Sequence, residues 1–158
     1  MRSFRPLLLI VVVSCSSGAG GKKTNTAPKQ LTPKDIVTQS SSAIVRIEAG
    51  EGTGTGFIVS SGGLVATNLH VVVGKKDIKV KLQGGEVYPV MQIAGVDRAR
   101  DLALLRIDPT KPLPAVRLGD SNKMSAGDQV VAIGNPLGVF DYSVSSGLVS
   151  AWRVLCSP

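Results

Sequence analysis

The residues best suited to chemistry are one histidine and an acid that follows it. His70 is the only histidine in the chain and stands in the run 66–72, directly before two valines, while Asp101 opens the apolar run 101–105. This order matches the first two members of a Ser-His-Asp triad that reads His, Asp, Ser along the chain. The serine should come last, on a glycine-rich turn. No G-x-S-x-G or similar turn occurs in the 158 residues.

Both residues also have ordinary structural interpretations. Taken alone, His70 is better explained as a core or loop histidine. Asp101 alone is better explained as the cap of a turn or the partner of Arg98 or Arg100. None of the later serines is a good candidate for the nucleophile. Ser121 has a turn pattern after Asp120, and a strand pattern contains Ser143, Ser145 and Ser146.

The elements that must position the pair are predicted to be short strands. Apolar residues alternate with polar ones, or form β-rich runs, between clusters of turn residues. The expected strands are 43–48, 57–59, 64–67, 78–82, 86–96 and 102–107, with Pro89 indicating an edge or a bulge. Six strands at this spacing predict a small closed barrel, with a short helix before it over 35–42. We expect His70 and Asp101 to face one cleft.

A second set of strands follows a proline-rich linker. Pro109, Pro112 and Pro114 mark the linker. The segments 116–121, 129–134 and 142–154 then predict the opening strands of a second barrel. The expected fold class is therefore all-β, a double β-barrel. Its first six-strand barrel occupies 35–110 and its second, truncated barrel occupies 111–158.

The N-terminus has the composition of an export signal. Arg2 and Arg5 precede the apolar run 7–13. That run is too short to span a bilayer as a helix, which needs about 20 residues. The sequence Val12-Val13-Ser14-Cys15 is similar to the lipobox of bacterial lipoproteins. It predicts a signal peptide over 1–14 and a lipidated Cys15 that contacts the membrane; the alternative is an ordinary secretory signal with an incidental cysteine.

Composition argues against several other classes. Residues 15–34 are small and polar, which is typical of a flexible tether. The net charge is +7, but no aromatic residues are interleaved with a basic face, so we expect no nucleic-acid partner. Two cysteines, Cys15 and Cys156, and one histidine are too widely separated to form a zinc site, so we expect no metal and no cofactor.

Several motifs in this order and spacing resemble the HtrA/DegP family of trypsin-like serine proteases, bacterial enzymes of the cell envelope. The resemblance covers about residues 35–151 and rests on the stretches 54–59, 67–72, 101–105, 118–121, 127–136 and 146–151. It implies a serine endopeptidase that acts on unfolded or damaged polypeptides in the periplasm. Members of the family tend to form trimers.

The resemblance also implies roles for single residues. His70 would be the general base and then the general acid, because an imidazole can take and give a proton near neutral pH. Asp101 would hold its other ring nitrogen. Gly54 and Gly56 would let the backbone pass close to the barrel wall. Leu69 is a departure, since the family usually has a small residue there.

Larger departures concern the second half. The Gly-Asn-Ser-Gly-Gly turn of the family does not occur in the 158 residues, nor does its PDZ domain, and the resemblance stops after Ala151. We therefore expect an exported fragment of such a protease, without its nucleophile and unable to hydrolyse peptide bonds. The alternatives are a non-catalytic binding lipoprotein with a protease-like barrel, or a remnant without function.

Overall fold

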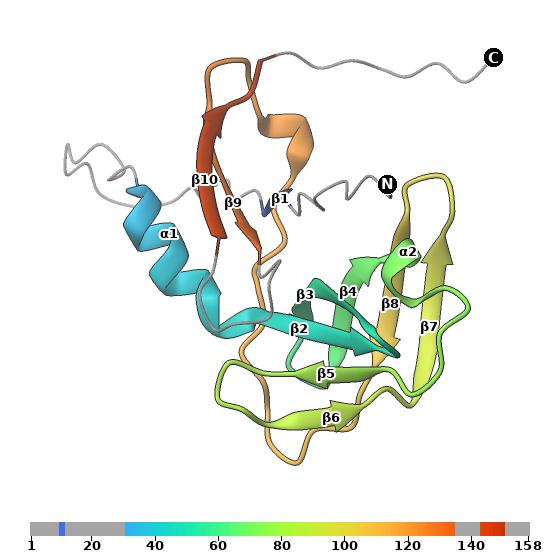
Figure 1. The fold of residues 1–158 in the computed structure, drawn as a ribbon. Helices are drawn as coiled ribbons and strands as arrows, with labels where there is room; N and C mark the ends of the chain where they lie inside the picture. Colours follow the sequence, from blue (N-terminus) through green and yellow to red (C-terminus); the bar gives the residue numbers. More distant parts are fainter. Residues whose placement is uncertain (1–9, 12–30, 135–142, 151–158) are drawn as a thin grey trace.

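The protein is mostly β-sheet with a few short helices (Figure 1). The computed structural model describes residues 10–11, 31–134 and 143–150. Cys15, Cys156, most of the predicted leader and nearly all of the predicted tether lie outside the described residues. The helical elements are α1 (Pro33–Ser40), η1 (Ser41–Ala43), α2 (Leu69–Val72) and η2 (Ser121–Lys123). The strands are β1 (Ile10–Val11), β2 (Ile44–Ala49), β3 (Gly52–Ser60), β4 (Leu64–Asn68), β5 (Lys79–Lys81), β6 (Val87–Pro89), β7 (Gln92–Asp97), β8 (Leu102–Arg106), β9 (Gln129–Gly134) and β10 (Ser143–Leu148).

The larger sheet has the strand order β6-β5-β2-β3-β4-β8-β7, and all its pairings are antiparallel. Its two end strands belong to one stretch of chain. At the joint, the Val90 amide donates to the Ile78 carbonyl at 2.9 Å, beside β5, and the Met91 amide donates to the Arg106 carbonyl at 2.8 Å, in β8. The sheet therefore closes on itself through residues 87–97. The barrel is confirmed, and five of the six predicted strands are found as single strands. The predicted strand 86–96 is divided into β6 and β7, with Pro89 next to the change of partner.

The helix before the barrel begins two residues earlier than predicted. The Thr32 side chain accepts from the Asp35 amide, and the Asp35 carboxylate accepts from the Thr32 amide, which forms a capping box with Pro33 in the first turn. This cap fixes the start of α1 at Pro33, and the 3₁₀ turn η1 occupies residues 41–43. Within the described ranges, no helix is long and apolar enough to cross a membrane.

A second sheet, of order β1-β9-β10, is not hydrogen-bonded to the barrel sheet and lies on the side of α1 (Figure 1). The prediction of a strand over 116–121 is wrong. Only the Val116 amide bonds to a strand, at the Ile58 carbonyl, and the Asp120 side chain accepts from the Asn122 amide to start η2. The segment predicted over 142–154 forms β10 at 143–148, and its residues 142 and 151–154 lie outside the described part.

Two separate apolar clusters hold these sheets. The larger fills the barrel and includes Ile47, Ile58 and Leu105, each fully buried. It also takes in Leu113, so part of the proline-rich linker packs on the barrel. The smaller cluster consists of Ile44, Val131 and Ile133, with Ile36, Val37 and Phe57 packed against them. Helix α1 therefore rests against β9.

Candidate active site

The barrel brings His70 and Asp101 to the same end of two neighbouring strands. β4 ends at Asn68, and α2 begins at Leu69, so His70 lies in a short helical turn directly after the strand. β8 starts directly after Asp101, and β4 and β8 pair antiparallel with Asn68 opposite Leu102. The end of one strand and the start of the other therefore meet, although 31 positions separate the two residues.

Asp101 holds both the ring and the backbone of the turn that carries His70. His70 Nδ1 lies 2.5 Å from Asp101 Oδ2, and the His70 amide donates to Asp101 Oδ1 at 2.9 Å. The Leu69 amide donates to the Asp101 carbonyl at 3.0 Å. The first amides of a helix lack partners within the helix and need acceptors from outside it. Asp101 therefore caps α2 from the turn before β8, which fixes the ring and the carboxylate relative to each other.

The structure does not pair Asp101 with a neighbouring arginine. Arg100 Nη1 instead donates to Asp97 Oδ2 at 2.7 Å, and Arg98 offers only its carbonyl, which accepts from the Asp101 amide at 3.4 Å. The backbone of Asp101 has a φ of 55°, in the left-handed region that aspartate tolerates better than most residues. This conformation allows one residue to offer its carbonyl and its carboxylate to the same turn.

The environment keeps the Asp101 carboxylate charged. Desolvation raises its pKa, but hydrogen bonds from the His70 ring, the His70 amide and the Asn68 side chain outweigh it and lower the pKa below its ordinary value. An ionised carboxylate can only accept hydrogen bonds, so Nδ1 carries a proton and, in the neutral ring, Nε2 is the acceptor. The His70 side chain is 56% exposed, which gives a reacting group access to the ring.

The predicted close approach to the barrel wall is confirmed at Gly56, whereas Gly54 closely approaches α2. A Cβ atom on Gly54 would lie 2.6 Å from Cγ1 of Val71, a residue of α2, and one on Gly56 would lie 2.9 Å from the Ala66 carbonyl oxygen. Gly54 thus lets α2 rest directly on β3. Leu69, the larger residue at a position where a small one was expected, is buried in the barrel core.

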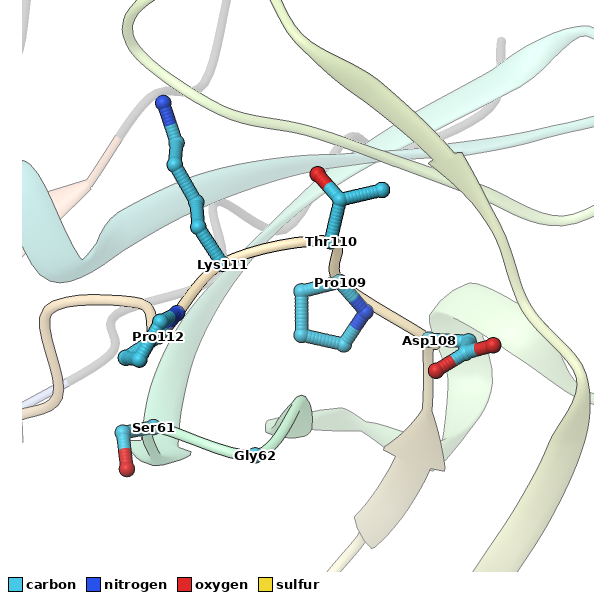
Figure 2. A pocket seen from close by; sticks show the side chains of 7 residues that line it. All are labelled: Ser61, Gly62, Asp108, Pro109, Thr110, Lys111 and Pro112. Atoms are coloured by element: carbon cyan, nitrogen blue, oxygen red, sulfur yellow. The ribbon is translucent and has the colours of Figure 1, made fainter.

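The other candidates lie elsewhere. Ser121 begins η2, while Ser143, Ser145 and Ser146 lie on the exposed strand β10, as the sequence predicts. A hollow lined by Ser61, Gly62 and residues 108–112 (Figure 2) lies at the opposite ends of β4 and β8 from His70. Among the described residues, no three His, Cys, Asp or Glu side chains are grouped to bind a metal.

The sequence did not predict a contact between Asn68 and the pair. Its Nδ2 donates to Asp101 Oδ2 at 3.2 Å, so it is a direct partner of the pair. The available signal was its position at the boundary between a strand and the turn that holds the histidine.

A closed β-barrel with a histidine–aspartate pair at one end defines a class, the trypsin-like serine peptidases. The family described as "Trypsin-like peptidase domain" matches residues 54–155, and the chain belongs to it as an HtrA-like member. A probable periplasmic serine endoprotease, DegP-like, of Rickettsia prowazekii is 44% identical over 98 residues, which are 62% of this chain and 19% of that protein.

Two further similarities extend over more of the chain. The magnetosome formation protease MamE of Magnetospirillum gryphiswaldense is 37% identical over 149 residues, which are 93% of this chain and 19% of that protein. The crystal structure of a serine endoprotease from Yersinia pestis superimposes with a TM-score of 0.68 at 31% identity, covering 77% of this chain and 45% of that one. This chain thus spans about a fifth of the length of the first relatives it matches.

Proposed function

We propose that the protein is an HtrA-type serine endopeptidase of the periplasm that acts on unfolded or damaged polypeptides. The observation that carries this proposal is the His70–Asp101 pair, whose carboxylate also caps the turn that holds the histidine. The relatives add support, since several are named probable periplasmic serine endoproteases. No cofactor enters this proposal.

In the proposed reaction, His70 Nε2 takes the proton of a serine hydroxyl while the serine oxygen bonds to the carbonyl carbon of the substrate. His70 then gives that proton to the leaving amine as the peptide bond breaks, and a water molecule later releases the acyl group by the same proton transfers. Asp101 keeps the proton on Nδ1 and stabilises the charged ring.

The 158 residues supply only two of the three groups. The Gly-Asn-Ser-Gly-Gly turn does not occur in them, and loss of the serine alone lowers kcat about 10⁶-fold in a comparable triad. We therefore expect the purified 158-residue chain to leave casein intact. Casein cleavage that disappears in His70→Ala would contradict this, because one of the dismissed serines would then be the nucleophile.

The proposed endopeptidase activity is tested on a longer gene product. Reading the DNA beyond codon 151 in all three frames shows whether a Gly-Asn-Ser-Gly-Gly turn is encoded there. A protein extended through that turn should cleave casein, and His70→Ala or alanine at the new serine should abolish the cleavage. A folded extended protein that leaves casein intact, or the lack of such a turn in any frame, would favour a binding protein or a remnant instead.

We also propose that residues 1–14, which include β1, are a signal peptide that is removed, and that acylated Cys15 anchors the mature protein through the tether at 15–34. The support is the lipobox-like sequence after a short apolar run. Stable anchoring needs more than one acyl chain. Mass spectrometry of the mature protein should find a multiply acylated Cys15 at its N-terminus, and Cys15→Ala should move the protein to the soluble fraction. An unmodified Cys15, or cleavage well beyond it, would contradict the proposal.

A further inference from the structure

Asn68 occupies the N-cap position of α2 without capping it. Its backbone is extended, with φ −78° and ψ 143°, as an N-cap requires, yet its side chain accepts no hydrogen bond from the helix. The His70 amide, which an N-cap side chain could satisfy, donates to Asp101 Oδ1 instead. Because Asp101 does the capping, the side chain of Asn68 is available for another contact.

That contact is with the carboxylate of the pair. Asn68 Nδ2 donates to Asp101 Oδ2, the same oxygen that accepts from His70 Nδ1. The amide oxygen of Asn68, in contrast, is buried without a hydrogen-bond partner. Leaving a buried acceptor unpaired is unfavourable. The amide therefore gains nothing from its oxygen in this position, and its nitrogen makes the interaction that matters.

We propose that Asn68 is a positioning residue that fixes the rotation of the Asp101 carboxylate and thereby holds His70 as the Nδ1–H tautomer. A carboxylate can rotate about its Cβ–Cγ bond. Here the His70 amide fixes Oδ1 and the Asn68 amide group fixes Oδ2, so Oδ2 stays directed at Nδ1. This tautomer leaves Nε2 free to accept a proton. The role of Asn68 rests on the proposed function, in which Nε2 accepts the proton of the serine.

The test reads the tautomer directly, in the full 158-residue chain. His70 is the only histidine, so the ring nitrogens give one unambiguous pair of ¹⁵N NMR signals. In the neutral ring, the two shifts report the ratio of tautomers. Asn68→Ser keeps a residue that can cap α2 but lacks the amide group. Asn68→Asp keeps the shape but replaces the donor by a second carboxylate. Asn122→Ala, in η2, is the matched control.

We expect the wild type and Asn122→Ala to hold the Nδ1–H form. Asn68→Ser and Asn68→Asp should lower the ratio of Nδ1–H to Nε2–H about tenfold, the equivalent of one hydrogen bond to a charged group, and speed exchange of the Nδ1 proton. An unchanged ratio in folded Asn68→Ser would overturn the proposal. The readout needs no hydrolysis, so a silent casein assay on the extended protein contradicts the proposed function and leaves the positioning role standing.

Discussion

Among single residues, Asp101 makes the stability of the folded site depend on pH. Desolvation raises its pKa, but the three hydrogen bonds it accepts lower the pKa below the ordinary 3.8. A group whose pKa is lowered by folding stabilises the folded state above its ordinary pKa. That contribution is lost as the pH falls through the lowered value. Asp101 should therefore hold the His70 ring and cap α2 fully at neutral pH, and should lose these contacts only in strong acid.

Asp101→Asn should make this visible, because asparagine tolerates the left-handed backbone at this position. The free energy of unfolding of the wild type minus that of the variant should be constant near neutral pH and should shrink as the pH falls below about 3.8. Urea unfolding at a series of pH values measures it, and the subtraction cancels the other carboxylates. A difference that stays constant into strong acid would show that the charge of Asp101 does not stabilise the fold.

At the level of elements, the position of α2 depends on the absence of a side chain on β3. An added Cβ on Gly54 would meet both γ-carbons of Val71, at 2.6 and 2.7 Å, distances that packed atoms do not adopt. Gly54→Ala should therefore push α2 outward and lower the free energy of unfolding by about 1–3 kcal/mol. The His70 NMR signals should shift with it. Thermal or urea unfolding and the His70 spectrum measure the two effects.

Two further variants separate this clash from a general effect of alanine in the strand. Gly52→Ala, in the same strand, would bring its Cβ no closer than 3.4 Å to the Ala49 carbonyl oxygen and should leave α2 in place. Val71→Ala removes the atoms that collide, so the double variant Gly54→Ala/Val71→Ala should restore the His70 signals. If Gly52→Ala shifts the His70 signals as much as Gly54→Ala, the contact with Val71 is not what seats α2.

In the whole molecule, the two apolar clusters differ greatly in size, and the elements held by the smaller cluster should unfold first. Ile133 of β9 is buried with Val131 of the same strand and Ile44 of β2, and α1 packs against them. Ile133→Ala should remove about 2–5 kcal/mol of packing energy from that cluster. Amide hydrogen exchange should then accelerate in β9, β10 and α1 while the barrel strands stay protected. Ile58→Ala, in the barrel core, is the comparison and should accelerate exchange throughout the barrel. Equal loss of protection in both sheets after Ile133→Ala would show a single cooperative unit.

The sequence predicts most of the barrel and only part of the site, for a physical reason. Strand alternation and turn residues are local signals, so the six strands and the end of β4 follow from short windows of sequence. The cap that Asp101 places on α2 joins residues that are distant in sequence, and no local pattern reports it. The wrong prediction of a strand at 116–121 shows that a local pattern is not sufficient. Apolar and polar residues alternate there, but only Val116 bonds to a neighbouring strand.

The stretch 87–97, which supplies both end strands of the larger sheet, sets an order of events as the chain is made. Residues 87–89 pair with β5, which lies before them in the sequence, but residues 92–97 pair with β8, which comes after them. The hairpin of β3 and β4 can therefore form early, while the barrel stays open until residues 102–106 have emerged. The same late strand brings Asp101 to α2, so closure of the barrel and assembly of the histidine–aspartate pair are one event in time.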